Sequence, residues 1–190
     1  MKKLITLGTL FFLVIPAYIA MSAGAPPAPG SQLPDIQITV PPEQADKSYL
    51  GLAGSSSTFR VPEVKGRVVI VEILSMYCPF CQKEAPVVNE LYGAIEKDPK
   101  LRGKIKIVGI GAGNTVYEVE LFRKKYAIPF PISPDPDSLI HKQVGEVRTP
   151  YFIAVKINDN GSHEVIYSKL GSFGEVDPFL DILRKASELQ

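Results

Sequence analysis

The stretch Val68–Leu74, with the sequence VVIVEIL, is a nearly unbroken run of β-branched and aliphatic residues. Such a run is typical of a strand that is buried on both faces of a parallel sheet. From Pro79 onward the pattern changes, because apolar residues recur mostly at intervals of three and four, as on one face of a helix. A buried strand followed closely by an amphipathic helix favours the α/β class of folds.

The remainder of the chain repeats this alternation and then adds a hairpin. A second apolar strand is expected at 105–110, and a second helix over 116–126. The segments 151–157 and 164–170 flank Asn160-Gly161, a strong short-range signal for a β-hairpin. A final amphipathic helix follows the hairpin. This order of elements predicts a mixed central sheet with helices on both faces.

The amino-terminal part of the chain indicates export. Residues 1–25 have the order of a secretory signal: two lysines, an apolar stretch at 4–20, and small residues that suit cleavage. The alternative is an uncleaved membrane anchor, because an apolar run of about 17 residues is near the lower limit for a membrane span. Both interpretations place the protein outside the cytoplasm, in the periplasm or on the outer face of the cytoplasmic membrane.

The domain boundaries follow from composition. Residues 26–34 are rich in Ala, Pro, Gly and Ser and are expected to form a linker. Residues 35–190 would then form a single domain, which begins with an N-terminal β-hairpin between residues 36 and 61. Lys and Arg total 21 against 20 Asp and Glu, and there is no dense basic cluster with interleaved aromatic residues. Nucleic acid is therefore not expected as a partner.

The chain has only two cysteines, Cys78 and Cys81. A disulfide between them closes so short a loop that it removes little entropy from the unfolded chain, so a stabilising role is not favoured. A zinc site needs four ligands, and the distant His141 and His163 complete the set poorly. Covalent haem attachment needs a histidine directly after the second cysteine, where Gln82 stands. The pattern favours dithiol redox chemistry, with no metal and no cofactor.

The position of the pair between a strand and a helix has a chemical consequence. The free N–H groups and the positive dipole end at a helix N-terminus stabilise a thiolate, so the pKa of Cys78 is expected to be lowered. Cys81, about one turn into the helix, is expected to be shielded and to resolve the mixed disulfide. Glu72 lies in the buried strand, where a carboxylate needs a partner or must stay protonated.

The stretch VVIVEILSMYCPFCQKEAPVV resembles the thioredoxin superfamily, and in particular its exported TlpA/ResA-like branch. The same likeness extends over most of residues 35–189. It includes the lead Lys65–Val69 and the segment 124–137, which resembles the branch's helix–strand insertion. The resemblance implies a thioredoxin fold with a central helix–strand insertion. Tyr77 stands where the family usually has Trp, and Phe80 stands where it commonly has Pro.

The resemblance also assigns roles to residues around the cysteines. Pro150 matches the family's cis-proline, which faces the active cysteine, and the backbone at Thr149 would pair with the substrate chain. The alternative is an ordinary trans-proline at the start of a strand. Tyr77, directly before the first cysteine, is also expected to take part in substrate binding.

Two acidic residues complete the candidate site. Glu72 matches an acid that relays the proton of the second cysteine, here Cys81. The alternatives for Glu72 are pairing with a lysine or a partly exposed strand position. Glu84 matches an acid that tunes the cysteines in ResA-like proteins, and the alternative is a solvated glutamate on the helix surface.

The function implied is thiol–disulfide oxidoreduction of protein substrates by an enzyme. The branch implies a reductant that is fed by a membrane electron donor, for example in cytochrome c maturation. A peroxiredoxin-like thiol peroxidase is a second hypothesis, in which Ser75 fits the motif but Val71 stands where proline is wanted. A third is a non-catalytic carrier that binds client proteins or metal. The direction of electron flow is left open.

Overall fold

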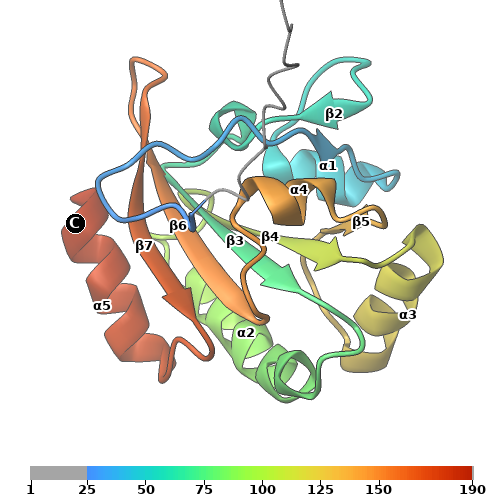
Figure 1. Ribbon diagram of the computed structural model, residues 1–190. Helices are drawn as coiled ribbons and strands as arrows, with labels where there is room; N and C mark the ends of the chain where they lie inside the picture. Colours follow the sequence, from blue (N-terminus) through green and yellow to red (C-terminus); the bar gives the residue numbers. More distant parts are fainter. Residues whose placement is uncertain (1–24, 190) are drawn as a thin grey trace, which may run out of the picture.

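The computed structural model describes residues 25–189 of the chain (Figure 1). Nearly all of the predicted export segment therefore lies outside the described residues. Within residues 25–189, no helix combines the length and the apolar character that crossing a membrane requires.

The centre of the molecule is a five-stranded sheet with the strand order β5-β4-β3-β6-β7 (Figure 1). The first three of these strands are parallel to one another, and β6 and β7 run antiparallel, so the predicted mixed sheet is confirmed. Gly161, with a φ of 80°, lies in the hairpin turn between β6 and β7. The strands are β3 (Val68–Leu74), β4 (Ile105–Ala112), β5 (Ile132–Asp135), β6 (Tyr151–Ile157) and β7 (His163–Leu170).

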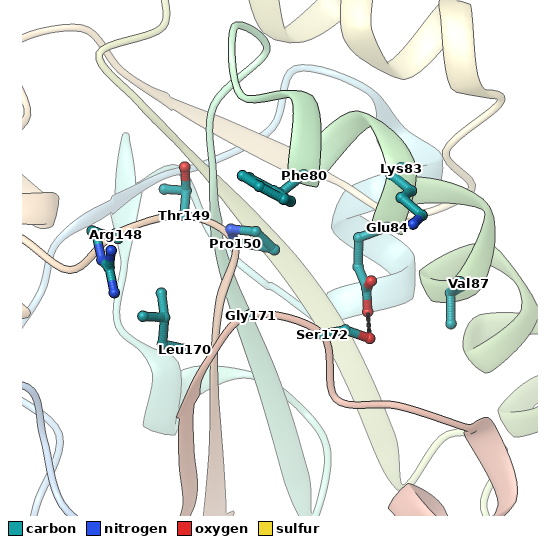
Figure 2. A pocket seen from close by; sticks show the side chains of 10 residues that line it. All are labelled: Phe80, Lys83, Glu84, Val87, Arg148, Thr149, Pro150, Leu170, Gly171 and Ser172. Carbon is teal, nitrogen blue, oxygen red and sulfur yellow. Dashed lines mark hydrogen bonds between the residues drawn. The ribbon is translucent and has the colours of Figure 1, made fainter.

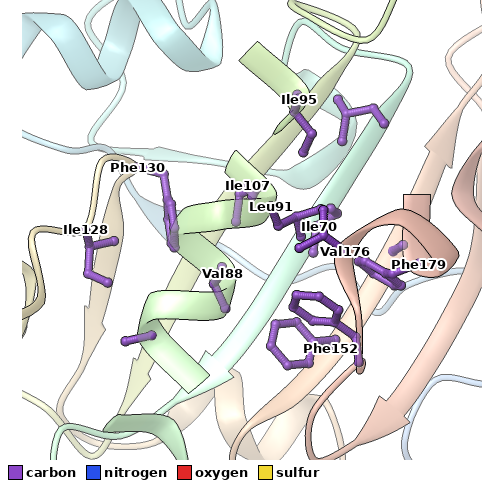
Figure 3. Close-up of a cluster of buried hydrophobic side chains, with 14 of the residues drawn as sticks. Ile70, Val88, Leu91, Ile95, Ile107, Ile128, Phe130, Phe152, Val176 and Phe179 are labelled. Carbon is purple, nitrogen blue, oxygen red and sulfur yellow. The ribbon is translucent and has the colours of Figure 1, made fainter. Parts of the chain in front are cut away.

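Helices cover both faces of this sheet. Side chains of α2 (Pro79–Lys97), α3 (Val116–Tyr126) and α5 (Val176–Ser187) pack into one hydrophobic cluster with the sheet. Figure 3 shows residues of α2 in this cluster beside those of the strands beneath it. Side chains of α1 (Gln44–Leu50) and α4 (Leu139–Gln143) belong to a second cluster on the opposite face. The helix α3 and the strand β5 together form the expected helix–strand insertion.

Strand β3 has no solvent-exposed face, which explains its continuous apolar sequence. Ile70 and Leu74 point into the cluster with α2, whereas Val71 and Ile73 point into the opposite cluster. Successive side chains of a strand alternate between its faces, so Glu72 shares the face of Ile70 and Leu74. The one carboxylate of the strand is thereby directed toward the helix that carries the cysteines.

The amino-terminal region packs around the sheet in two ways. Strands β1 (Ile38–Thr39) and β2 (Thr58–Phe59) pair antiparallel, as expected for the N-terminal hairpin, although the unpredicted helix α1 lies between them. The segment predicted as a linker makes two backbone hydrogen bonds to Val165 of β7, from Gly30 N and to Ser31 O, each of 2.8 Å. These bonds cover part of an edge strand that would otherwise present unpaired backbone groups.

Candidate active site

The two cysteines lie at the junction between β3 and α2. Cys78 is the N-cap residue of α2, and Pro79 occupies the first helical position, where its lack of an N–H group costs nothing. Cys78 is partly exposed, whereas Cys81 is fully buried. The two cysteine side chains are 3.3 Å apart, and both thiols are free. This separation allows a bond between them with little rearrangement.

The two thiols differ in acidity. Burial acts to raise the pKa of Cys78, but hydrogen bonding with the Thr149 side chain and with the N–H groups of Cys81 and Phe80 outweighs it and lowers that pKa below its usual 9.0. Burial raises the pKa of Cys81 to about 12. At neutral pH, Cys78 is therefore the thiol with the larger thiolate fraction, and Cys81 remains protonated.

The loop before β6 faces the first cysteine. The Sγ atom of Cys78 lies 3.2 Å from the carbonyl oxygen of Thr149. The peptide bond between Thr149 and Pro150 is cis. Tyr77, directly before Cys78 in the chain, is 66% exposed, and its hydroxyl contacts Oε1 of Glu118 in α3. The loop of Thr149 and the cis-Pro150 therefore lies beside the sulfur of Cys78, whereas the Tyr77 side chain reaches toward α3.

Glu72 is buried on the face of β3 that α2 covers. Its burial, and then the negative charge of Glu84, raise the pKa of Glu72 from its usual 4.5 to about 8. Desolvation disfavours the charged form of a carboxyl group, and a second carboxylate nearby adds to that effect. A carboxyl group with this pKa can exchange protons near neutral pH.

Glu84 is buried, with 6% of its surface exposed, and so is not a solvated glutamate on the helix surface. Its Oε1 atom accepts a hydrogen bond of 2.8 Å from the hydroxyl of Ser172, in the loop after β7 (Figure 2). The Oγ atom of Ser172 in turn accepts a hydrogen bond of 3.0 Å from the N–H of Gly174. The helix α2 is thereby joined to the loop that leads into α5.

Sequence reasoning missed two side chains that hold the loop before Cys78. Oδ1 of Asn114, which is 1% exposed, accepts a hydrogen bond of 2.8 Å from the N–H of Met76. Nε2 of Gln82 donates a hydrogen bond of 2.8 Å to the carbonyl oxygen of Met76. Asn114 follows the carboxyl end of β4, the strand beside β3. The polar Asn114 just after a predicted strand could have indicated this contact from the sequence, because side chains at the carboxyl ends of parallel strands converge.

A groove with a volume of about 520 Å³ lies beside the cysteine pair (Figure 2). Its walls come from the start of α2, from the loop before β6 and from the end of β7. Its lining residues are Phe80, Lys83, Glu84, Val87, Arg148, Thr149, Pro150, Leu170, Gly171 and Ser172. The groove is thus continuous with the loop that contacts Cys78.

The mixed sheet, the cysteine pair at a strand–helix junction and the neighbouring proline loop define a protein of the thioredoxin fold. The chain belongs to the AhpC/TSA family, whose sequence model matches residues 29–163.

Individual relatives agree with this assignment. The thiol-disulfide oxidoreductase ResA of Bacillus thuringiensis subsp. konkukian is 33% identical over 89 residues, which are 46% of this chain and 48% of the relative. ResA of Halalkalibacterium halodurans is 27% identical over 135 residues, 70% of each chain. The chain thus spans about half the length of the first relative. A secreted disulfide oxidoreductase of Mycobacterium tuberculosis has the same fold, with a TM-score of 0.53 and 17% identity over 78% of this chain and 95% of that one.

Proposed function

We propose that this chain catalyses thiol–disulfide exchange with protein disulfides, using Cys78 as the nucleophile and Cys81 as the resolving thiol. The observation that carries the proposal is the difference between two adjacent thiols: Cys78 is partly exposed with a lowered pKa, and Cys81 is fully buried with a raised pKa. A nucleophile needs access and thiolate character, whereas a resolving thiol needs only to reach its partner. The relatives named thiol-disulfide oxidoreductase support the same chemistry.

The proposed reaction proceeds in two exchanges. The Cys78 thiolate attacks one sulfur of the substrate disulfide, so that an S–S bond forms between enzyme and substrate and the other substrate sulfur leaves as a thiolate. Cys81 then loses its proton and attacks the sulfur of Cys78, which releases the second substrate thiol and leaves the enzyme as a Cys78–Cys81 disulfide. The substrate gains two electrons and two protons, and the enzyme loses them.

Glu72 is proposed as the group that takes the proton of Cys81 during the second exchange. Its buried carboxyl group faces the same helix, and its pKa of about 8 allows it to release and accept a proton near neutral pH. Glu84, held by Ser172, is proposed to act through Glu72, because its negative charge is one of the causes of that raised pKa. Glu84 is therefore a positioning residue in this proposal.

Substrate binding is proposed at the loop formed by Thr149 and Pro150, together with the exposed Tyr77 that directly precedes Cys78. The contact between Cys78 and the carbonyl group of Thr149 supports this, because a chain bonded to that sulfur must pass the loop. We further propose that residues 1–25 export the protein, that 26–34 follow as a connecting segment, and that residues 35–190 carry the activity. In that setting the enzyme would be a reductant supplied by a membrane electron donor, with cytochrome c maturation as one use.

The decisive test is the reduction potential of the Cys78–Cys81 pair, measured by equilibration in graded thiol buffers followed by alkylation of the remaining thiols. A value at or below about −250 mV, near that of thioredoxin, supports a reductant. A value near about −120 mV would instead make the protein a donor of disulfides. If the pair forms no reversible disulfide, the proposed function is wrong.

A further inference from the structure

The groove beside Cys78 is lined by two cations, Lys83 and Arg148, and by one buried carboxylate, Glu84. Figure 2 shows Arg148 and Lys83 at opposite sides of the groove, with Pro150 and Phe80 between them. Within residues 25–189, neither cation lies within 4.0 Å of a carboxylate oxygen. Arg148 differs in this from four other arginines of the chain, which each make such an ion pair: Arg60, Arg67, Arg123 and Arg184. Among the lysines of residues 25–189, only Lys156 makes one, so Lys83 resembles the rest.

The surface between these two cations is apolar. Phe80 is 72% exposed, and Leu170, at the end of β7, is 39% exposed. Val87 and Pro150 also line the groove. Large apolar side chains that meet solvent in a concave surface next to a reactive sulfur are typical of a binding site. The groove therefore offers apolar contact in its middle and positive charge at its edges.

The acidic group in the groove does not cancel this charge at its rim. Glu84 is buried and already accepts a hydrogen bond from Ser172. Lys83 and Arg148, in contrast, are exposed. A ligand that lies across the groove meets the two cations before it meets the Glu84 carboxylate.

We infer that this groove binds an extended segment of the partner protein in which apolar residues and acidic residues flank the reactive cysteine. The inference rests on the proposed function and specifies its substrate class. Arg148 directly precedes Thr149, whose carbonyl group contacts Cys78, so a segment bonded to Cys78 passes within reach of Arg148. A further hollow, of about 510 Å³, shares Arg148 and Thr149 with the groove, but the exposed Glu146 also lines it, so the acidic residues of the segment are placed in the groove itself.

The test uses two synthetic peptides of equal length, each with one cysteine linked through a disulfide to a neutral thiopyridine. Both carry an apolar residue next to the cysteine. One has glutamate residues flanking this pair, and the other has glutamine in the same places. Attack of Cys78 on the peptide sulfur releases the thiopyridine, whose absorbance gives the rate constant. Oxidised glutathione serves as a third, non-protein disulfide.

The reduced full-length protein is expected to react about three- to tenfold faster with the acidic peptide than with the neutral one, a preference that high salt removes. Lys83→Gln and Arg148→Gln should each reduce the preference, and the double variant should abolish it. Lys124→Gln removes the same charge from an exposed position on α3, outside the groove, and should leave the preference unchanged.

The outcomes separate the inference from the proposed function. If the wild-type protein reacts with neither peptide, the proposed function itself fails. If it reacts equally with both, or if Lys124→Gln lowers the preference as much as Lys83→Gln does, the acidic substrate class is wrong while the exchange reaction stands. A faster reaction with oxidised glutathione than with the acidic peptide would also overturn the inference.

Discussion

The hydroxyl of Ser172 donates a hydrogen bond of 2.8 Å to the carboxylate of Glu84, and so joins the loop after β7 to the helix that carries both cysteines. The charge of Glu84 contributes to the raised pKa of Glu72, on the strand below that helix. Ser172, Glu84 and Glu72 thus come from separate parts of the chain, and the charge that Ser172 holds in place on Glu84 raises the pKa of Glu72.

Replacing Ser172 by alanine should destabilise the protein. A hydrogen bond to a charged group contributes about 1.5–3 kcal/mol, and the buried Glu84 carboxylate would lose its partner. We expect the free energy of unfolding in urea to fall by about 1–2 kcal/mol, because water can partly replace the exposed hydroxyl. Ser55→Ala, at an exposed serine outside the site, is the control and should have almost no effect. Equal stability of the two variants would contradict the role of the Ser172–Glu84 bond.

The two cysteines should differ strongly in reactivity. Iodoacetamide at neutral pH should modify Cys78 first, because its pKa is lowered, and should spare Cys81, which is buried with a pKa of about 12. Cys81→Ser should accumulate a mixed disulfide with substrate, whereas Cys78→Ser should form none. Mass spectrometry of the alkylated protein and non-reducing gels give the result. Full turnover by Cys81→Ser would rule out its role as the resolving thiol.

The ionisation of the buried Glu72 should make the folded protein less stable as the pH rises. Its carboxyl group titrates near pH 8 in the folded protein and near 4.5 when unfolded, so the folded state binds more protons between these values. The free energy of unfolding contributed by this group therefore falls as pH rises from about 4.5 to about 8 and is constant above that. Glu72→Gln should remove the loss and be the more stable protein above pH 8, by at most about 5 kcal/mol. Urea unfolding of both proteins at about pH 5 and about pH 9 measures this difference, which should be small at the lower pH.

Although Glu72→Gln should stabilise the folded protein above pH 8, it should slow the second exchange of the reaction. Without a carboxylate to accept the proton of Cys81, the release of substrate from the mixed disulfide should slow by about 100-fold in Glu72→Gln. In the wild-type protein this step should accelerate as pH rises toward 8, where the carboxylate form of Glu72 becomes abundant. Stopped-flow measurement of the second exchange across pH tests this. If Glu72 has only a structural role, the rate of the second exchange should depend on pH in the same way in the variant and in the wild-type protein.

Asn114 should stabilise the loop before Cys78. In Asn114→Ala the N–H of the half-buried Met76 loses an acceptor that is itself 1% exposed, which should cost about 2 kcal/mol of stability. The attack of Cys78 on substrate should also slow, because the loop is less well held. Gln82→Ala removes the other side-chain bond to Met76 at a partly exposed position and should cost less. The order of the two urea midpoints decides whether the bond to the buried Asn114 is the more important.

Several features of the fold could be predicted because they depend on local sequence. The continuous apolar run of β3 requires both of its faces to be covered, and the spacing after Pro79 defines a helix, so the position of the cysteine pair between them follows directly. The helix α1 was missed, because its seven residues are mostly polar and lie among turn-forming residues. Its position depends on packing, since Leu50 is buried in the cluster on the far face of the sheet.

The environment of the site was decided by the tertiary structure. Spacing alone left Glu84 either on the surface of α2 or turned toward the core, and its burial became known only once the loop containing Ser172 was placed against it. Asn114 and Met76 are 38 residues apart, and Arg148 and Lys83 are 65 apart in sequence, yet each pair borders one small region. By itself the sequence determined which residues can carry redox chemistry, because thiol spacing and apolar periodicity are local properties. Burial and charge around those thiols arise from segments that meet only when the chain folds, so the tertiary structure decided them.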